Sequence, residues 1–389
     1  MMVPDNEKTV DLPQDPAPTG GQTDVKPTET EDYFVASQWS LMWRKLKKHK
    51  LAMGAAGVLI IIYVCAIFAE FFAPYTPFRN NSQRTFAPPQ RVRMIGPDGL
   101  TWPFVYDFER TVDPISFRRL YEPDPEKMVR LRFFVPGEPY KVFGLIPARV
   151  RLFGVDEGQV YLLGADHLGR DVLSRIMYGV RISGSIGLIG VAMSFVLGLL
   201  IGGFSGYYGG ALDNVIQRLI EFIRSIPTLP LWMALSAALP PHWHPMRIYL
   251  FITIILSVLG WTGLARVVRS KFLSLRHEDF VVASRLIGCS EFRVIFRHML
   301  PSFMSHVIAA ITLAVPHMIL GETALSFLGL GLRAPIVSLG TLMQQAQNVA
   351  TIAHSPWLLL PGLVVGIMVL AFNFLGDGLR DAADPYSRG

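Results

Sequence analysis

The chain has 389 residues, of which 51% are hydrophobic and 17% charged, and its mean hydropathy is +0.37. Soluble domains carry about one quarter charged residues, so this composition excludes an ordinary soluble globule and predicts a membrane protein. The formal charge of +6 does not indicate nucleic-acid binding, because the basic residues gather beside apolar stretches. With two cysteines, Cys65 and Cys289, the sequence offers neither a disulfide framework nor a zinc site.

The N-terminal region predicts a tail followed by a membrane anchor. Residues 1–40 are expected to form a disordered cytoplasmic tail, since they contain few apolar side chains. The first apolar stretch, Leu51 to Phe72, is long enough to cross about 30 Å of hydrocarbon. It starts too late for a cleaved signal peptide and is expected to stay in the protein. A cytoplasmic N-terminus is predicted by the basic cluster of Arg44, Lys45, Lys47, Lys48 and Lys50.

Further apolar stretches predict five more crossings. The short stretch from Ile226 is extended back through Val215 to Arg224, whose charge would snorkel to the interface. Six crossings return the C-terminus to the cytoplasm, and the basic loops then also fall inside. The five stretches are Ile182–Phe204, Ile226–Leu239, Ile248–Leu264, Phe303–Leu320 and Trp357–Leu375.

Between the first and second crossings, residues 74–177 are rich in charged, Pro and Gly residues and are expected to be extracytoplasmic. Val129 to Val135 and Tyr140 to Ile146 predict a β-hairpin whose four-residue loop is Pro136-Gly137-Glu138-Pro139. We therefore expect a small α/β or β-rich subdomain in this insert.

Between the fourth and fifth crossings, residues 266–301 form a basic loop in which two short helices are predicted. The first runs from Glu278 to Ile287 and ends at Gly288, which readily adopts a left-handed conformation. Ser290 is expected to cap the second, with Glu291 in its first turn. Its predicted apolar face, at positions i, i+3, i+4 and i+7, consists of Phe292, Ile295, Phe296 and Met299.

The spacing of Val282-Ala283-Ser284, Gly288 and His298-Met299-Leu300-Pro301 resembles the E-A-A-x3-G-x9-I-x-L-P loop of ABC importer permeases. The departures are Val282 for Glu, Ser284 for Ala and His298 for Ile. In that family the loop forms a coupling helix that docks into a cytoplasmic ATPase. The resemblance therefore implies ATPase coupling by Val282, Ala283, Ser284, Gly288, Glu291, Phe292, Ile295, Phe296, His298, Leu300 and Pro301.

Wider motifs resemble the C-type subunit of dipeptide and oligopeptide permeases. They are Leu163–Asp171, Tyr178–Ser183, Gly206–Gly210, Leu325–Gly331 and Ala371–Asp381. This resemblance implies an all-α polytopic fold with six transmembrane helices, the type I ABC importer permease fold. Its parts would be an N-terminal permease region at 41–90 and a core of five helices at 178–389.

The same resemblance implies a function and partners. The chain would be a non-catalytic permease subunit in the bacterial inner membrane, importing di- or oligopeptides by alternating access. The implied partners are a B-type permease, two ATP-binding subunits that hold ATP and Mg, and a periplasmic solute-binding protein. The chain itself contains no Gly-x4-Gly-Lys-Ser/Thr phosphate loop, so no cofactor is expected in it.

Several single residues leave alternatives open. Glu322, at the end of the fifth crossing, is a candidate for the transport pathway or a structural pairing. If it lines the pathway, Glu322→Gln should lower transport without lowering assembly. His306 and His317 fit packing or pore wetting better than a proton or metal route, because no metal-binding motif accompanies them.

Small residues and charges near the second crossing predict close contacts. Gly198, Gly202, Gly203 and Gly206 give the small-xxx-small spacing that permits tight helix packing, with a hinge as the bolder alternative. Pairs at the inner membrane face are expected from Asp213, Arg218 and Glu221.

Other functions stay open at this point. Oligosaccharides, opines or another small solute could replace peptides in the same family. An ion-coupled secondary transporter would need an ion route and inverted repeats, and the nearly charge-free crossings do not favour it.

Overall fold

The computed structural model describes residues 38–96, 99–115, 119–142, 146–156 and 158–383. Most of the predicted tail 1–40 lies outside these residues, and its last three belong to the first helix. The helices are α2 (Gln38–Lys48), α3 (Lys50–Ile67), α4 (Ala69–Phe72), α5 (Val172–Tyr208), α6 (Gly210–Ser225), α7 (Thr228–Ala237), α8 (Pro245–Leu275), α9 (Asp279–Leu286), α10 (Glu291–Arg293), α11 (Leu300–Phe327), α12 (Leu339–Gln344), α13 (Val349–His354) and α14 (Leu360–Ala383). The strands are β1 (Arg93–Gly96), β2 (Gly99–Val112), β3 (Arg119–Arg130), β4 (Arg132–Val142) and β5 (Ile146–Gly154).

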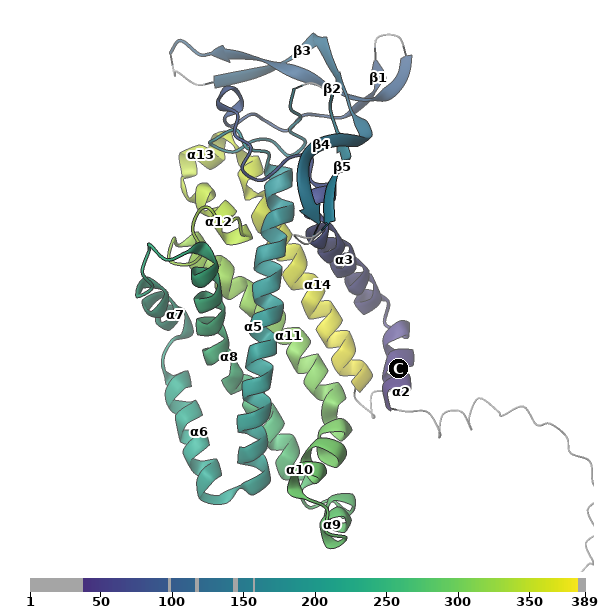
Figure 1. Cartoon of the computed structure of the whole chain (residues 1–389), viewed down its shortest axis with the longest axis vertical. Helices are drawn as coiled ribbons and strands as arrows, with labels where there is room; N and C mark the ends of the chain where they lie inside the picture. The colour runs from purple at the N-terminus through teal and green to yellow at the C-terminus, as the bar shows by residue number, and fades with distance from the viewer. Residues whose placement is uncertain (1–37, 97–98, 116–118, 143–145, 157, 384–389) are drawn as a thin grey trace, which may run out of the picture. The chain divides into compact units, whose positions relative to one another are not determined.

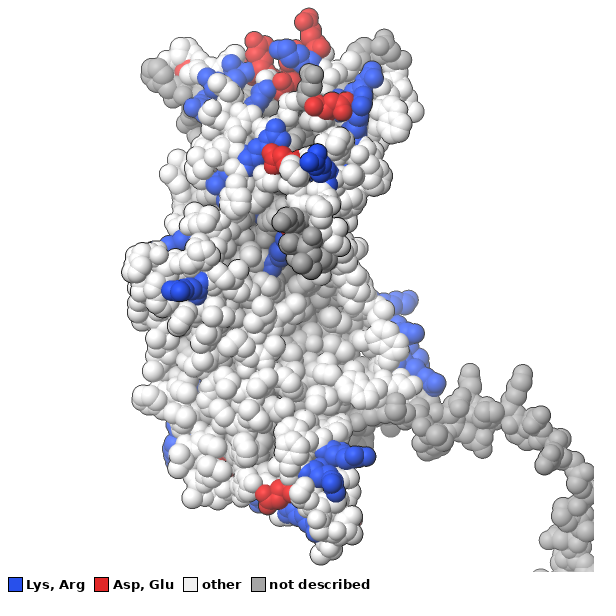
Figure 2. All heavy atoms as spheres, in the orientation of Figure 1, with Lys and Arg blue, Asp and Glu red and all other residues white. Residues whose placement is uncertain are grey.

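The long helices are apolar over lengths that suit a bilayer. Within the described part of the chain, five stretches are long and apolar enough to cross a membrane: Lys50–Ile67, Val172–Tyr208, Pro245–Leu275, Glu291–Phe327 and Pro356–Ala383. The strands lie at the end where α5 begins, and α9 and α10 lie at the opposite end (Figure 1). Charged side chains gather at these two ends and, as a row of basic groups, along α2 at the right edge, whereas most of the helical surface between the ends is free of charge on the face shown in Figure 2. The fold is therefore helical and polytopic.

The predicted third crossing is not one helix. The expected helix from Val215 to Leu239 divides into α6 and α7, which are separated by Ile226 and Pro227 in extended conformation. Pro227 has no N–H to donate to the Ile223 carbonyl, and it disfavours a helical conformation at the preceding residue. The prediction of a continuous helix here was wrong.

Helices α5 and α8 pack closely because of glycines on α5. A Cβ atom at Gly202 would overlap the backbone of Ala265, and one at Gly206 would lie 2.6 Å from the carbonyl oxygen of Arg269. Since lipid is as apolar as a leucine side chain, close packing rather than exclusion of water holds such helices together. The prediction of tight packing from the small-xxx-small spacing is confirmed.

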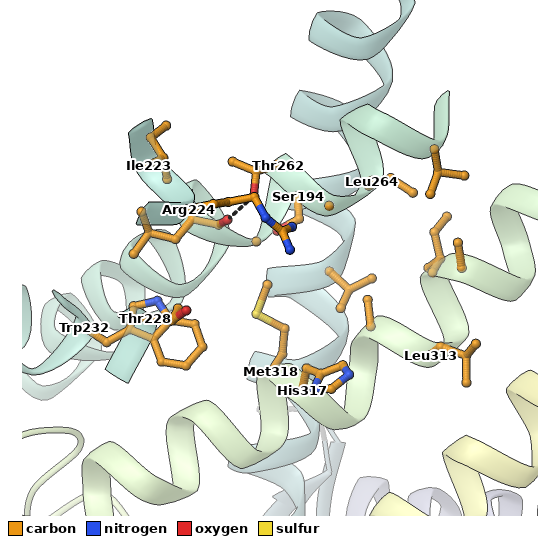
Figure 3. Close-up of a pocket in the computed structure, with 18 of the residues that line it drawn as sticks. Ser194, Ile223, Arg224, Thr228, Trp232, Thr262, Leu264, Leu313, His317 and Met318 are labelled. Carbon is orange, nitrogen blue, oxygen red and sulfur yellow. Dashed lines mark hydrogen bonds between the residues drawn. The ribbon is translucent and has the colours of Figure 1, made fainter. Parts of the chain in front are cut away.

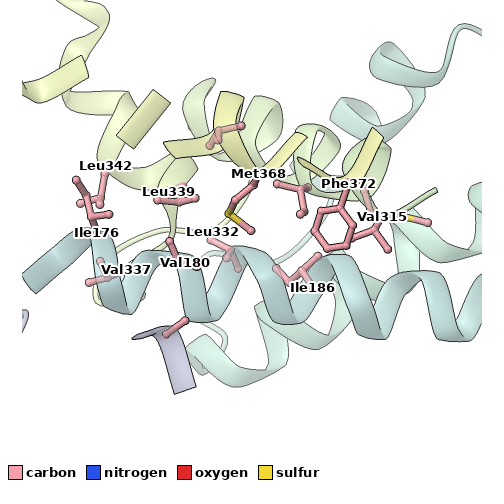
Figure 4. Close-up of a cluster of buried hydrophobic side chains, with 14 of the residues drawn as sticks. Ile176, Val180, Ile186, Val315, Leu332, Val337, Leu339, Leu342, Met368 and Phe372 are labelled. Carbon is pink, nitrogen blue, oxygen red and sulfur yellow. The ribbon is translucent and has the colours of Figure 1, made fainter. Parts of the chain in front are cut away.

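The main apolar core lies between α5 and the helices of the C-terminal half. Ile176, Val180 and Ile186 point from α5 toward α11, α12 and α14, where Met368 and Phe372 fill the facing space (Figure 4). The core therefore joins elements that are far apart in the sequence.

The insert is β-rich, but its hairpin differs from the predicted one. Strands β1, β2 and β3 form one antiparallel sheet, and β4 pairs with β5 in a second sheet. Pro136-Gly137-Glu138-Pro139 lies inside β4 as a register irregularity, and β4 is followed by residues 143–145, outside the described residues. Proline is tolerated there because β4 is an edge strand, with no ladder hydrogen bond required on its open side. The predicted four-residue loop was wrong.

A buried carboxylate organises the connection from the strands to α5. Asp166 accepts backbone N–H groups from Leu168 (2.8 Å) and Arg170 (3.0 Å), and its other oxygen receives the guanidinium groups of Arg170 and Arg175. Asp171 then caps α5 by accepting the N–H of Ser174 at 2.8 Å. The motif Leu163–Asp171 thus fixes where the long helix begins.

Candidate coupling surface and transport cavity

The predicted coupling residues lie on α9, α10 and the turn that follows them. Helix α9 ends at Leu286, and Gly288, two residues later, has a φ of +79°, a left-handed conformation that favours glycine. The Gly288 N–H donates to the Arg285 carbonyl (3.0 Å) and the Cys289 N–H to the Ser284 carbonyl (3.1 Å), which forms a Schellman motif. The predicted end of the first short helix is confirmed.

The second short helix is not separate. Ser290 stands at its N-cap and Glu291 lies in its first turn, as predicted, but the Ser290 side chain makes no capping hydrogen bond. From Glu291 the chain continues through a π-helical turn, Val294–Met299, directly into α11. The wider turn accommodates Pro301, which would otherwise clash with the carbonyl of Arg297.

The π-helical turn also divides the predicted apolar face. Val294 and Met299 are fully buried, whereas Phe292 and Phe296 are exposed with their ring centroids 4.4 Å apart. Ile295 packs beside the buried cluster. The prediction of one face assumed 3.6 residues per turn, and the π-helical turn changes that phase.

Exposed apolar side chains gather where α9 ends and α10 begins. Leu286 is 82% exposed, Ile287 79% and Phe292 71%, and we call these three residues the coupling surface. Val282 and Ala283 are also exposed, but Ser284 is buried and donates its hydroxyl to the Phe280 carbonyl. Exposed apolar groups of this kind mark a surface that another protein covers.

Two tyrosines at the end of α5 hold this segment in place. The Tyr208 hydroxyl donates to a carboxylate oxygen of Glu291 at 2.8 Å, and the Arg285 guanidinium lies 4.9 Å from the centre of the Tyr207 ring. Sequence reasoning did not assign these tyrosines a contact, although the motif Gly206–Gly210 contains both. The coupling surface is therefore attached to α5 as well as to α11.

The charged residues predicted to pair near the same end do so. Asp213 on α6 receives Nε and one terminal nitrogen of Arg269 on α8, each at 2.5 Å, and the Ser205 hydroxyl from α5. Arg218 pairs with Glu221 at 2.8 Å on the exposed face of α6. The Asp213 partner lies 56 residues away, so a local sequence pattern could not identify it.

Glu322 lies in a packed network of hydroxyl groups. Its carboxylate is fully buried and receives the hydroxyl of Ser183 on α5 (2.7 Å) and that of Ser326 (2.8 Å). Each serine oxygen in turn accepts a backbone N–H, from Leu339 and Leu332 respectively. This arrangement joins α5, α11 and α12, and its geometry is that of a structural pairing.

A cavity of about 660 Å³ lies elsewhere, between α5, α6, α7, α8 and α11. Its walls are mainly apolar, and Figure 3 shows Arg224, Trp232 and His317 among the side chains that line it. Glu322 and His306 are not among its lining residues. The sequence pointed to Arg224 only as a snorkelling charge, because the cavity is built from five helices that no local pattern brings together.

Comparisons with known proteins place this fold. Residues 194–389 match the family model described as "Binding-protein-dependent transport system inner membrane component", and residues 37–89 match the "N-terminal TM domain of oligopeptide transport permease C". The chain belongs to the family of binding-protein-dependent transport system inner membrane components. Strands β1 to β5 of this inner membrane component fall between the two matched parts.

Similar proteins cover most of the chain. The dipeptide transport system permease protein DppC of Bacillus subtilis (strain 168) is 31% identical over 348 residues, 89% of this chain and 85% of that protein. DppC of Lactococcus lactis subsp. cremoris (strain MG1363) is 32% identical over 346 residues, 88% of this chain and 89% of that protein. The oligopeptide transport system permease protein OppC of Bacillus subtilis is 35% identical over 226 residues, 58% of this chain and 72% of that protein.

Proposed function

We propose that this chain is the permease subunit of an ATP-driven importer of di- and oligopeptides in the bacterial inner membrane. Two similar proteins that are named for dipeptide transport align with more than four fifths of its length. The observation that carries the proposal is the coupling surface, an exposed apolar group at the end of the molecule opposite the strands.

The coupling surface is where an ATPase subunit binds. Covering Leu286, Ile287 and Phe292 removes apolar area from water and connects the partner directly to α11 through the π-helical turn. Two ATP-binding subunits hold ATP and Mg²⁺ and perform the hydrolysis, so the chain itself is not an enzyme. Its role is to convert movement at α9 into a change of the transport pathway.

The remaining partners follow from the membrane arrangement. Helices α6 and α7 together supply a sixth, interrupted crossing, which leaves both chain ends in the cytoplasm and the strands outside the membrane. A solute-binding protein delivers peptide on the strand-bearing side. A B-type permease completes the pathway, to which the cavity contributes, and the two permeases work by alternating access.

Uptake by the reconstituted complex tests this function. Vesicles that contain ATP are mixed outside with the binding protein and a labelled dipeptide, and initial uptake is measured. The double variant Leu286→Asp, Ile287→Asp is expected to lose uptake and ATPase copurification, because binding would bury two unpaired charges. Val349→Asp is the matched control, since Val349 is 78% exposed on α13, away from the coupling surface. Uptake without ATP, or of oligosaccharides in place of peptides, would contradict the proposal.

Labelling of single cysteines tests the membrane arrangement. Cys65 and Cys289 are first replaced by Ala, and a cysteine is placed at Ile115 in the insert or at Ile287 on the coupling surface. In cells that express the chain without the ATP-binding subunits, so that position 287 is uncovered, a membrane-impermeant maleimide should label position 115 in intact cells and position 287 only after permeabilisation. The reverse pattern would refute the orientation.

A further inference from the structure

The interruption between α6 and α7 lies in the wall of the cavity. Ile226 and Pro227 are extended, with ψ angles of 129° and 126°, so the helix is broken beside Arg224 and Thr228, which both line the cavity. Irregular backbone at membrane depth is tolerated where it is buried in protein or lines a cavity, and broken helices are a recurrent feature of transport sites. The break is therefore part of the cavity's construction.

Three of the polar side chains that line the cavity have no hydrogen-bond partner among the described residues. Within the described residues, the Arg224 guanidinium and the His317 ring make no hydrogen bond or ion pair, and the buried Trp232 indole N–H has no partner. No carboxylate is among the described lining residues. Ser194 and Thr262 differ, because their hydroxyls already donate to the backbone carbonyls of Ser257 and Leu259. The cavity thus presents one fixed positive charge with no negative charge to balance it.

These features define the ligand that would fit. A volume of about 660 Å³ lies within the range of small-ligand sites, and the apolar walls suit hydrophobic side chains. An arginine fork binds a carboxylate through two parallel hydrogen bonds, and an indole N–H suits a carbonyl oxygen. A short peptide carries both acceptors close together, at its free C-terminus and its last peptide bonds.

We propose that Arg224 binds the C-terminal carboxylate of the peptide in transit, while Trp232 donates to a peptide carbonyl. This assignment rests on the proposed peptide transport and adds a recognition step inside the membrane. Figure 3 shows the Arg224 side chain reaching from α6 toward Thr262 and Ser194 of the neighbouring helices. The guanidinium lies close to Gly263 on α8, where a Cβ atom would stand 3.8 Å from it, so α8 leaves space for the charged group.

The test compares two peptides in the complete reconstituted transporter. Initial uptake of alanyl-phenylalanine and of its C-terminal amide is measured at concentrations that saturate the binding protein, for the wild type, Arg224→Gln and Arg218→Gln. Arg224→Gln should lower uptake of the free acid about tenfold or more, the effect of losing a charge-assisted hydrogen-bond pair. Uptake of the amide should stay within about twofold of the wild-type value, because the amide has no charge for Arg224 to bind. Any preference of the binding protein cancels, since the same protein delivers both peptides to every variant.

Arg218→Gln is the matched control, because Arg218 lies on the same helix but pairs with Glu221 on its exposed face. It should change neither uptake. Equal loss of both peptides in Arg224→Gln would overturn the proposal and assign Arg224 to a lipid phosphate or to a carboxylate of the second permease. Unchanged uptake of both peptides would also overturn it.

A second variant decides the matter if Arg224→Gln does not assemble. Arg224→Lys keeps the charge but loses the planar fork, so the ratio of acid to amide uptake should fall by about threefold. An unchanged ratio would overturn the proposal. If the wild type imports neither peptide with ATP present, the proposed function fails and this assignment fails with it, whereas wild-type uptake with equal losses rejects the assignment alone.

Discussion

Pro227 and Pro301 each follow a helical stretch, and the backbone responds to these two prolines in opposite ways. At Pro301 the preceding residue, Leu300, stays helical with φ −57° and ψ −45°, and the helix continues from Glu291 to Phe327. At Pro227 the preceding residue, Ile226, is extended with φ −86° and ψ 129°, and the helix ends. A π-helical turn before Pro301 widens the backbone where the proline ring would clash, and residues 210–226 before Pro227 contain no such turn.

The two outcomes produce different mechanical properties. The helix from Glu291 to Phe327 links the coupling surface at one end to the Glu322 network at the other and stays helical throughout, although Pro316 inside it has no N–H to donate. The broken helix gives up that continuity and gains a cavity lined by side chains from both of its halves. A transporter of the proposed kind needs both a rigid connection to the ATPase and a wall that can change.

The largest expected effect comes from interrupting the helix that runs from Glu291 to Phe327. Phe296→Pro removes a hydrogen-bond donor within the π-helical turn and costs about 3 kcal/mol or more, so peptide uptake should fall by about 100-fold or more. Phe296→Ala, the control, truncates the same side chain but keeps the backbone donor, and it should retain most of the uptake. Both are measured as initial rates in reconstituted vesicles, with membrane insertion checked by cysteine labelling. A Phe296→Pro transporter with wild-type uptake would show that continuity is not required.

Restoring a continuous helix across the interruption between α6 and α7 should have the next largest effect. Pro227→Ala restores an N–H that can donate to the Ile223 carbonyl and favours a continuous helix by about 3 kcal/mol. Uptake per ATP hydrolysed should fall by about tenfold, since each 1.4 kcal/mol corresponds to a factor of ten and part of the gain is lost to packing. Pro230→Ala is the matched control, because Pro230 lies in the first turn of α7, where no donor is needed. Equal behaviour of the two alanine variants would refute a role for the break.

Glu322→Gln tests the hydroxyl network near the end of α11. The amide retains one acceptor oxygen but presents an NH₂ group to a serine hydroxyl that now donates to the carboxylate, so the folded complex should lose about 1–3 kcal/mol of stability. Its melting temperature should fall, while uptake per assembled complex stays at the wild-type level. Ser302→Ala, on an exposed part of α11, is the control. A selective loss of uptake at normal stability would return Glu322 to the pathway.

The smallest expected effect is at Tyr208. Tyr208→Phe removes one solvent-exposed hydrogen bond to Glu291, and exposed hydrogen bonds contribute little because water competes for them, so uptake should fall by roughly twofold. If the two groups act together, adding Glu291→Gln to Tyr208→Phe should cause no further loss. Fully additive losses in this double-mutant cycle would indicate that the hydrogen bond does not matter for coupling.

The sequence predicted features that depend on local composition. Apolar stretches located the long helices, the spacing of Gly202 and Gly206 located the close contact with α8, and Gly288 located the end of α9. Each of these follows from a property of a residue or of its near neighbours, so no knowledge of the fold is needed to use it.

Features that depend on distant partners or on departures from regular geometry were not predictable in this way. The π-helical turn changed which of Phe292 and Val294 is buried, because a period of 3.6 residues does not apply there. Pro136 to Pro139 were expected to turn the chain, but an edge strand accepts them. The role that we propose for Arg224 depends on a cavity that five helices enclose, and no local sequence pattern brings those helices together.

The hydroxyl network at Glu322 limits how the molecule can deform. The network joins α5 to α11 at the end near the strands, and the glycine contacts join α5 to α8 along their length. These three helices therefore form one rigid unit. A force applied at Leu286 would tilt α5, α8 and α11 together. The angle between α6 and α7 would then change at Ile226 and Pro227. This angle would set the width of the peptide pathway.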